Sequence, residues 1–200
     1  MSNLTGTINE LRSVSGVAGT ALANSASAAV LNPASAAGYF PVAFWEGGPM
    51  YRSWRVTSKG VYSTAASGNP TLQVGVTLDS AQGTTGALTF LSGATVVIIS
   101  AASWFWEMDV ELTAQAVTET SGAGTVNIVG IGTLTLHRIA LPGTFTQGTT
   151  VNADRIPIGA SATVAQSMTA GFFIETYAKW GSAVAGTSIQ ALTTRVYGEN

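Results

Sequence analysis

Alternation of apolar and polar residues with a period of two dominates the chain from residue 38 onward. The clearest case is TLQVGVTL (71–78), where the apolar positions are Leu72, Val74, Val76 and Leu78. Successive side chains of a strand point to opposite faces, so this pattern predicts a strand with one buried and one polar face.

Four other segments have the residue content of strands, and Gly-, Pro- and Asn-rich turn sequences separate them. The apolar run TVVIIS is typical of a strand buried on both faces. In the second segment, Gly130 and Gly132 are expected to mark a bulge or bend. The pattern as a whole predicts an antiparallel β-sandwich or barrel. The four segments are TVVIIS (95–100), TVNIVGIGTLTLHRIAL (125–141), GFFIETYAKWG (171–181) and SIQALTTRVYG (188–198).

The stretch SWFWEMDVELTAQAV (103–117) interleaves aromatic with acidic residues and is expected to form one long strand. Alternation places Trp104, Trp106, Met108, Val110, Leu112 and Ala114 on one face. It places Phe105, Glu107, Asp109, Glu111 and Thr113 on the other.

Three uses of the carboxylates Glu107, Asp109 and Glu111 are compatible with this strand. They are a solvated or interfacial face, a contact with a cation or polar partner, or a hydrolase pair formed by Glu107 and Glu111. Glycosidase pairs usually come from different strands that meet in a cleft, whereas neighbours along one strand face are usually solvated. We therefore expect the first use.

Residues 1–37 differ from the rest of the chain, because they are rich in Ala, Ser, Gly and Asn and contain no aromatic residue. The spacing of Leu4, Ile8 and Leu11, with Thr7 and Glu10 as a capping box, permits a short helix. We expect an extended, partly helical N-terminal arm over residues 1–37 and a β-sandwich domain over residues 38–200. The few side chains of the arm that can bury area on a partner are Leu4, Ile8, Leu11, Val14 and Val17.

Charged residues make up only 9% of the chain, against about 25% in ordinary soluble domains. So sparse a charge favours a protein that covers part of its surface with copies of itself or with a neighbour. The net charge of -2 and the dispersed basic residues argue against a nucleic-acid partner. No run of 18 apolar residues predicts a membrane span, and the N-terminus lacks the features of a signal peptide. We expect a protein made in a reducing cytoplasm.

The sequence holds no pattern that predicts catalysis or a cofactor. Cysteine is absent, and His137 is the only histidine, which excludes a metal site with two histidines from one chain. Neither a nucleophile elbow nor a phosphate-binding glycine loop is present. We therefore expect no enzyme activity, no cofactor and no metal.

A second concentration of aromatic residues lies in PVAFWEGGPMYRSWRV (41–56). Beside Arg52 and Arg55 these side chains could form a sugar-stacking surface, although core or interface packing is their more frequent use. The candidates for a subunit interface or for ligand stacking are Phe44, Trp45, Tyr51, Trp54, Trp104 and Trp106.

A small-residue arm that leads into AAGYFPVAFWEGGPMYRSWRVTSKGVYST, NPTLQVGVTL, SWFWEMDVELTA and a terminal strand pair resembles the jelly-roll virion proteins of tailed bacteriophages. These proteins include capsid decoration, head-fibre and minor tail proteins. The resemblance covers roughly residues 38–198 and rests on pattern and composition. It implies a jelly-roll homotrimer that binds the major capsid protein or another virion protein, and it carries no catalytic motif.

On this reading, the arm holds the trimer on the phage head and the protein decorates or stabilises the shell. Deletion of residues 1–37 is then expected to leave a folded trimer that no longer binds particles. The alternative is a minor tail or tail-fibre protein that binds host-surface glycan through its exposed aromatic residues and the acidic strand.

Overall fold

The computed structural model describes residues 9–33, 38–42, 52–65, 70–84, 88–97, 101–120, 123–140, 153–159, 164–167 and 169–199. Over these ranges the chain is all-β, with fourteen strands and no α-helix. The strands are β1 (Asn9–Ser15), β2 (Leu22–Ala23), β3 (Ala29–Val30), β4 (Gly38–Phe40), β5 (Ser53–Ser63), β6 (Thr71–Asp79), β7 (Leu88–Ser92), β8 (Thr95–Val96), β9 (Trp104–Thr120), β10 (Ala123–Ala140), β11 (Ala153–Gly159), β12 (Val164–Ser167), β13 (Phe172–Trp180) and β14 (Ser188–Glu199).

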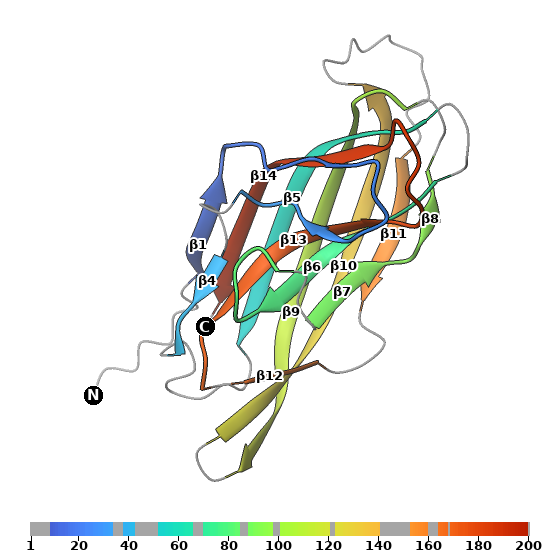
Figure 1. Ribbon diagram of the computed structural model, residues 1–200. Coiled ribbons are helices and arrows are strands. Elements are labelled where there is room, and N and C mark those ends of the chain that lie inside the picture. The colour runs from blue at the N-terminus through green and yellow to red at the C-terminus, as the bar shows by residue number, and fades with distance from the viewer. Residues whose placement is uncertain are drawn as a thin grey trace.

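One antiparallel hydrogen-bonded sheet joins the fourteen strands (Figure 1). Its main order is β1-β14-β5-β9-β10-β11-β7-β6-β13-β3, and the short strands β2, β4, β8 and β12 pair alongside members of this series. Within it, β9 and β10 form the longest hairpin, and β5 and β14 lie beside β9. Strands 53–63 and 188–199 are therefore neighbours although they are far apart in sequence.

The sheet bends so that side chains from distant strands meet in one core. Trp54 of β5 packs edge-to-face on Phe172 of β13 with ring centroids 5.8 Å apart, although five strands separate β5 from β13 in the sheet order. Phe40 of β4 stacks on Phe172 at 5.3 Å, and the three aromatic side chains are fully buried. The core therefore lies between the two halves of one bent sheet.

Most of the strands predicted from the alternation are confirmed. Leu72, Val74, Val76 and Leu78 of β6 are all fully buried, as their spacing predicts. β9, β10, β13 and β14 cover the segments predicted around residues 103–117, 125–141, 171–181 and 188–198. Of the expected strand 95–100, Thr95–Val96 forms β8, and residues 98–100 lie outside the described ranges.

The bulge expected at Gly130 and Gly132 lies elsewhere. The pairing of β10 with β9 shifts between Asn127 and Ile128 and stays regular past both glycines. A side chain at Gly130 would come within 2.6 Å of the ring of Phe90, and one at Gly132 would overlap the carbonyl oxygen of Asp109. Close packing against neighbouring groups, rather than a bulge, accounts for these two glycines.

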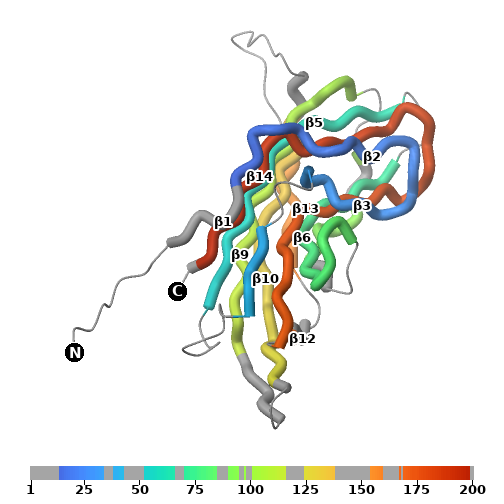
Figure 2. The backbone as a smooth tube through the Cα atoms, turned by 60° about the vertical axis from the view of Figure 1, so that its left-hand side comes forward, coloured from blue at the N-terminus to red at the C-terminus, as the bar shows by residue number. Residues whose placement is uncertain are grey.

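The described part of residues 1–37 contributes strands to the sheet and contains no helix, so the expected partly helical arm is not confirmed. Asn9–Ser15 is strand β1 on β14, β2 also pairs with β14, and β3 pairs with β13. Figure 2 shows this segment running beside β14 and then reaching β13. The physical reason is that short strands can satisfy their backbone groups on an existing sheet edge without large side chains. Residues 1–8, which include Leu4 and Ile8, lie outside the described ranges.

Candidate functional site

The acidic side of β9 faces outward, as the alternation predicts. Trp106, Met108, Val110 and Leu112 are buried, whereas Asp109 and Glu111 are exposed. Polar residues of the neighbouring strands share this outer face because antiparallel partners directly opposite each other point to the same side of a sheet.

Strand register arranges this outer face in three rows that cross β14, β5, β9, β10 and β11 in that order. The acids of β9 form the central column, with basic or hydroxyl side chains on β5 and mainly threonines on β10. Two arginines stand on the outer columns, Arg195 on β14 and Arg155 on β11. The rows are Thr193–Lys59–Glu107–Thr135–Arg155, Arg195–Thr57–Asp109–Thr133–Pro157 and Tyr197–Arg55–Glu111–Ile131–Gly159.

Two of the central acids are paired with the bases of β5. Nε and Nη2 of Arg55 donate to the two carboxylate oxygens of Asp109 at 2.9 and 2.5 Å, a bidentate arrangement. Nζ of Lys59 lies 3.4 Å from Oε2 of Glu107, and Nε2 of His137 lies 3.4 Å from Oε1 of the same carboxylate. The side chains of Arg55 and Asp109 are about half exposed. Such exposed pairs contribute only about 0–1 kcal/mol to folding stability.

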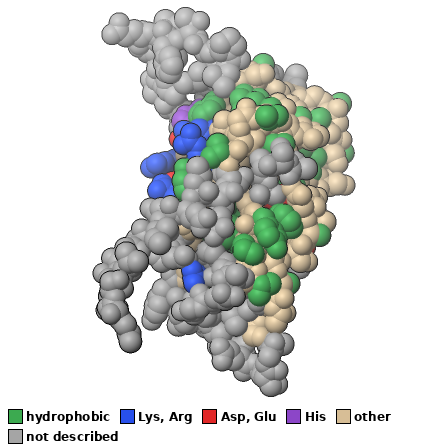
Figure 3. Space-filling view, turned by 90° about the vertical axis from the view of Figure 1, so that its left-hand side faces the viewer, with side chains coloured by type: hydrophobic (Ala, Val, Ile, Leu, Met, Phe, Trp, Pro, Cys, Tyr) green, Lys and Arg blue, Asp and Glu red, His purple; other side chains and the backbone are tan. Residues whose placement is uncertain are grey.

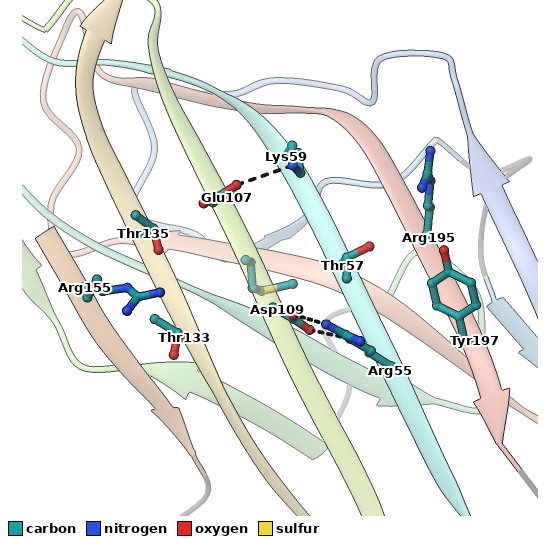
Figure 4. A pocket seen from close by; sticks show the side chains of 11 residues that line it. Arg55, Thr57, Lys59, Glu107, Asp109, Thr133, Thr135, Arg155, Arg195 and Tyr197 are labelled. Atoms are coloured by element: carbon teal, nitrogen blue, oxygen red, sulfur yellow. Dashed lines mark hydrogen bonds and ion pairs between the residues drawn. The ribbon is translucent and has the colours of Figure 1, made fainter. Parts of the chain in front are cut away.

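A groove of about 690 Å³ runs over this face, and we call it the charged groove (Figure 4). Its volume lies within the range of ligand sites, about 300–1,000 Å³. Four of the eight Lys and Arg residues of the chain line it. The lining residues are Arg55, Thr57, Lys59, Glu107, Met108, Asp109, Thr133, Thr135, Arg155, Arg195 and Tyr197.

The two outer arginines of the charged groove are exposed and are not engaged by acids. Among the residues that the structure describes, neither Arg155 nor Arg195 has a carboxylate within 4.0 Å. In Figure 4, Arg155 extends toward Thr133 and Thr135, and Arg195 stands on the opposite side of the groove beside Tyr197. The groove therefore offers two separate guanidinium groups to anionic substituents.

The geometry disfavours the hydrolase pair of Glu107 and Glu111. A separation of four residues on a strand places their backbones about 13 Å apart, whereas glycosidase carboxyls lie about 5–9.5 Å apart. Asp109 stands between them and is held by Arg55. Within the described ranges, no three His, Cys, Asp or Glu side chains are grouped in a way that could hold a metal ion.

The aromatic candidates fall into three groups. Trp54 and Trp106 are fully buried in the core, so neither can stack on a ligand or a partner, and both are corrected to core residues. Nε1 of Trp106 donates to the carbonyl oxygen of Gln190 at 3.2 Å. Trp104 is half-buried and packs edge-to-face on Tyr62. Phe44, Trp45 and Tyr51 lie outside the described residues.

Of the proposed arm anchors, Val14 and Val17 are 52% and 67% exposed, so both side chains are available to a partner. Leu11 lies in β1.

Sequence reasoning did not single out Lys59, Arg155 and Arg195 of the charged groove. The alternation in SWRVTSK, which puts Arg55, Thr57 and Lys59 on one face, was an available signal for part of it.

A second polar cluster lies away from the groove, on β6 and β13. Glu175 is buried, and its Oε2 accepts a hydrogen bond of 2.9 Å from the backbone N–H of Gly83. Its Oε1 and the hydroxyl of Thr77, opposite in register, have no hydrogen-bond partner among the described residues. Burial raises the pKa of Glu175; the Gly83 N–H opposes this effect, and the charge of Asp79 adds to it.

Glu175→Gln is expected to raise the free energy of unfolding at pH 7. A raised pKa means that the folded chain holds the proton more tightly than the unfolded chain. The contribution of Glu175 to stability therefore falls as the pH rises from the ordinary pKa of glutamate, about 4.3, through the raised pKa. Glutamine keeps an acceptor for Gly83, so the gain should be present at pH 7 and shrink toward pH 4.

Urea unfolding at both pH values measures this difference. Glu111→Gln, which removes an exposed carboxyl, is the matched control and should change the unfolding midpoint little at either pH. A Glu175→Gln protein whose unfolding midpoint matches that of the parent at pH 7 would contradict the expectation.

In the described ranges, no helix is long and apolar enough to cross a membrane. No protein-family model matches the sequence, and no curated protein matches it.

Proposed function

We propose that the protein is a non-enzymatic virion structural protein: a jelly-roll β-sandwich subunit that forms homotrimers and decorates a bacteriophage capsid. The observation that carries this proposal is the segregation of charge on the surface. Six of the 18 charged residues (8 basic and 10 acidic) line the charged groove. The other twelve charged residues are spread over the remainder of a 200-residue chain, and so sparse a charge suits close packing against other subunits.

Figure 3 shows this segregation on the side of the molecule that carries β1. Most Lys and Arg side chains in this view gather toward one margin, and the remaining described surface is largely uncharged or hydrophobic. Exposed apolar side chains elsewhere include Val14, Val17, Tyr39 and Val42. Tyr39 also packs on Phe173, which extends the apolar surface at β13.

The bend of the sheet supports the sandwich part of the proposal. Contact between Trp54 of β5 and Phe172 of β13 brings two non-adjacent parts of the sheet face to face. In a β-sandwich, the two inner faces form the core in this way. The long strands β5, β9, β10 and β14 would make one layer, and β6, β7 and β13 would contribute to the other.

Attachment to the shell is assigned to the surface of β1 and the residues that follow it. Val14 and Val17 provide exposed apolar area there, whereas the described residues from Leu22 to Asn32 are largely occupied by pairing with β13 and β14. A weak contact repeated three times in a trimer gains avidity, so small apolar anchors are sufficient.

We expect the purified chain to have a solution mass of about three 20.4 kDa chains by light scattering. The double variant Val14→Lys, Val17→Lys should keep this mass and lose co-sedimentation with phage capsids assembled without the protein. The control is Ile131→Lys, which charges an equally exposed apolar residue on the groove face. A monomeric parent chain, or decoration that survives the double substitution, would overturn the proposal.

A further inference from the structure

We propose that the charged groove binds an acidic glycan, a saccharide chain that bears carboxylate or sulfate groups. This proposal does not depend on the virion role, because it rests only on the residues that line the groove. The alternative of glycan binding relied on exposed aromatic side chains, but two of its candidates, Trp54 and Trp106, are buried. The groove supplies a different surface, made of cations and hydroxyl groups.

The cations of the groove divide into two kinds. Arg55 and Lys59 are held by Asp109 and Glu107, whereas Arg155 and Arg195 face no carboxylate within 4.0 Å among the described residues. A guanidinium presents a planar fork of N–H donors that matches carboxylate and sulfate oxygens. The groove therefore has two cationic positions ready for anionic substituents.

The spacing of the two arginines indicates an extended ligand. Arg195 is on β14 and Arg155 on β11, and β5, β9 and β10 lie between them. Four inter-strand spacings separate their backbones by about 19 Å. The two side chains stand on opposite sides of the groove in Figure 4, so a chain of several sugar units that lies across the strands can reach both.

The middle of the groove suits the hydroxyl groups of such a chain. Thr57, Thr133 and Thr135 line it, and each threonine hydroxyl both donates and accepts hydrogen bonds. The carboxylates of Glu107 and Asp109 are acceptors for sugar hydroxyls, and their charges are already balanced by Lys59 and Arg55. Donors and acceptors therefore alternate along the path between the two free arginines.

Two other classes of ligand fit the groove less well. A nucleic acid is disfavoured by the net charge of -2 and by the dispersal of the basic residues, of which four line the groove. A protein partner gains most of its affinity from aromatic or apolar anchors in pockets. The described lining offers one aromatic side chain, Tyr197, and the largely buried Met108.

The test is titration calorimetry of the full chain at low ionic strength with defined probes. The acidic probes are an oligogalacturonate, which carries carboxylates, and a heparin-derived oligosaccharide, which carries sulfates. A neutral malto-oligosaccharide, polyglutamate and single-stranded DNA are the comparison ligands. We expect at least one acidic saccharide to bind with a Kd of about 1 mM or tighter, and its affinity to fall as salt is added.

Arg155→Gln and Arg195→Gln should each weaken this binding about tenfold, and the double variant about a hundredfold. Both arginines are exposed, so the variants should fold normally, as circular dichroism can verify. Lys179→Gln removes an exposed cation of β13, outside the groove, and is the matched control that should bind like the parent.

Loss of acidic-saccharide binding in the arginine variants, but not in Lys179→Gln, supports the assignment. The tighter of the two acidic probes identifies the substituent. Equal binding of the neutral saccharide, stronger binding of DNA or polyglutamate, undiminished binding by the double variant, or no binding of either acidic probe would each overturn it.

Discussion

A chain that lacks residues 1–37 is expected not to fold, which replaces the folded trimer expected from the sequence alone. The described part of this segment fills core and sheet positions. Leu31 is fully buried, and replacing such a leucine by alanine alone costs about 2–5 kcal/mol. The deletion also removes the partner strands β1, β2 and β3.

Hydrogen bonds to the body of the sheet would be lost with the same segment, at roughly 0.5–1.5 kcal/mol each, and more where a buried donor is left unpaired. The free energy of unfolding of a domain is about 5–15 kcal/mol, so the combined loss is comparable with the total stability of the protein. The bonds are Gly19 N to Ala191 O, Asn24 N to Thr187 O, Leu31 N to Thr176 O, Thr176 N to Asn32 Oδ1, Trp180 Nε1 to Leu22 O, Gln190 Nε2 to Gly19 O and Gly186 N to Asn24 Oδ1.

Near-ultraviolet circular dichroism and urea unfolding of the truncated chain measure the outcome, and we expect no cooperative transition. Leu31→Ala in the full chain should still fold, with its free energy of unfolding lowered by about 2–5 kcal/mol. Val17→Ala, which truncates an exposed side chain in the same segment, is the control and should change stability by less than about 0.5 kcal/mol. A truncated chain that unfolds cooperatively like the parent would show that residues 1–37 are a separate arm.

The N-terminal segment shows that amino-acid composition alone does not predict whether a stretch of small residues joins a sheet. Its Ala, Ser and Gly residues lack the bulk to build a core, which suggested an arm. In the structure the segment adds backbone hydrogen bonds to β13 and β14 and places Leu31 in a core that other strands have built. Whether small residues form an arm or edge strands depends on the partner edges, and these are far away in sequence.

The strands themselves were predictable because a period of two reports burial directly. β9 confirms both faces that the alternation assigned, down to the exposed acids and the buried Trp106. The period-two alternation alone does not show that Trp54 lies in the core. An aromatic side chain on a strand looks the same in the sequence whether it faces the core, a ligand or another subunit.

The charged groove could be predicted only in part. Alternation shows that Arg55 and Lys59 share a face of one strand, and that Glu107 and Asp109 share a face of another. That these faces adjoin, and that Arg155 and Arg195 complete the rows, depends on the pairing of five strands from residues 53 to 199. Such long-range register is set by the whole sheet and not by any local sequence.

Gly60→Ala is expected to destabilise the protein severely, because Gly60 lies where three groups meet. A Cβ at Gly60 would overlap the carbonyl oxygen of Gln190 and lie 2.8 Å from Nε1 of Trp106. That carbonyl accepts the hydrogen bond from Trp106, whose side chain is fully buried. The added methyl must therefore move β14 away from β5 or leave the indole N–H without its acceptor, at a cost of roughly 3 kcal/mol or more.

Urea unfolding followed by tryptophan fluorescence measures this effect. Gly16→Ala is the matched control, because a Cβ there meets nothing within 4 Å and its backbone is not left-handed. We expect the control to stay within about 0.5 kcal/mol of the parent. Because Arg195 on β14 faces Thr57 on β5 across the same strand pair, a folded Gly60→Ala protein should also bind the acidic saccharide more weakly. Equal stability of the two alanine variants would mean that β5 and β14 do not approach each other at Gly60 as described, and the rows of the charged groove would then need a different register.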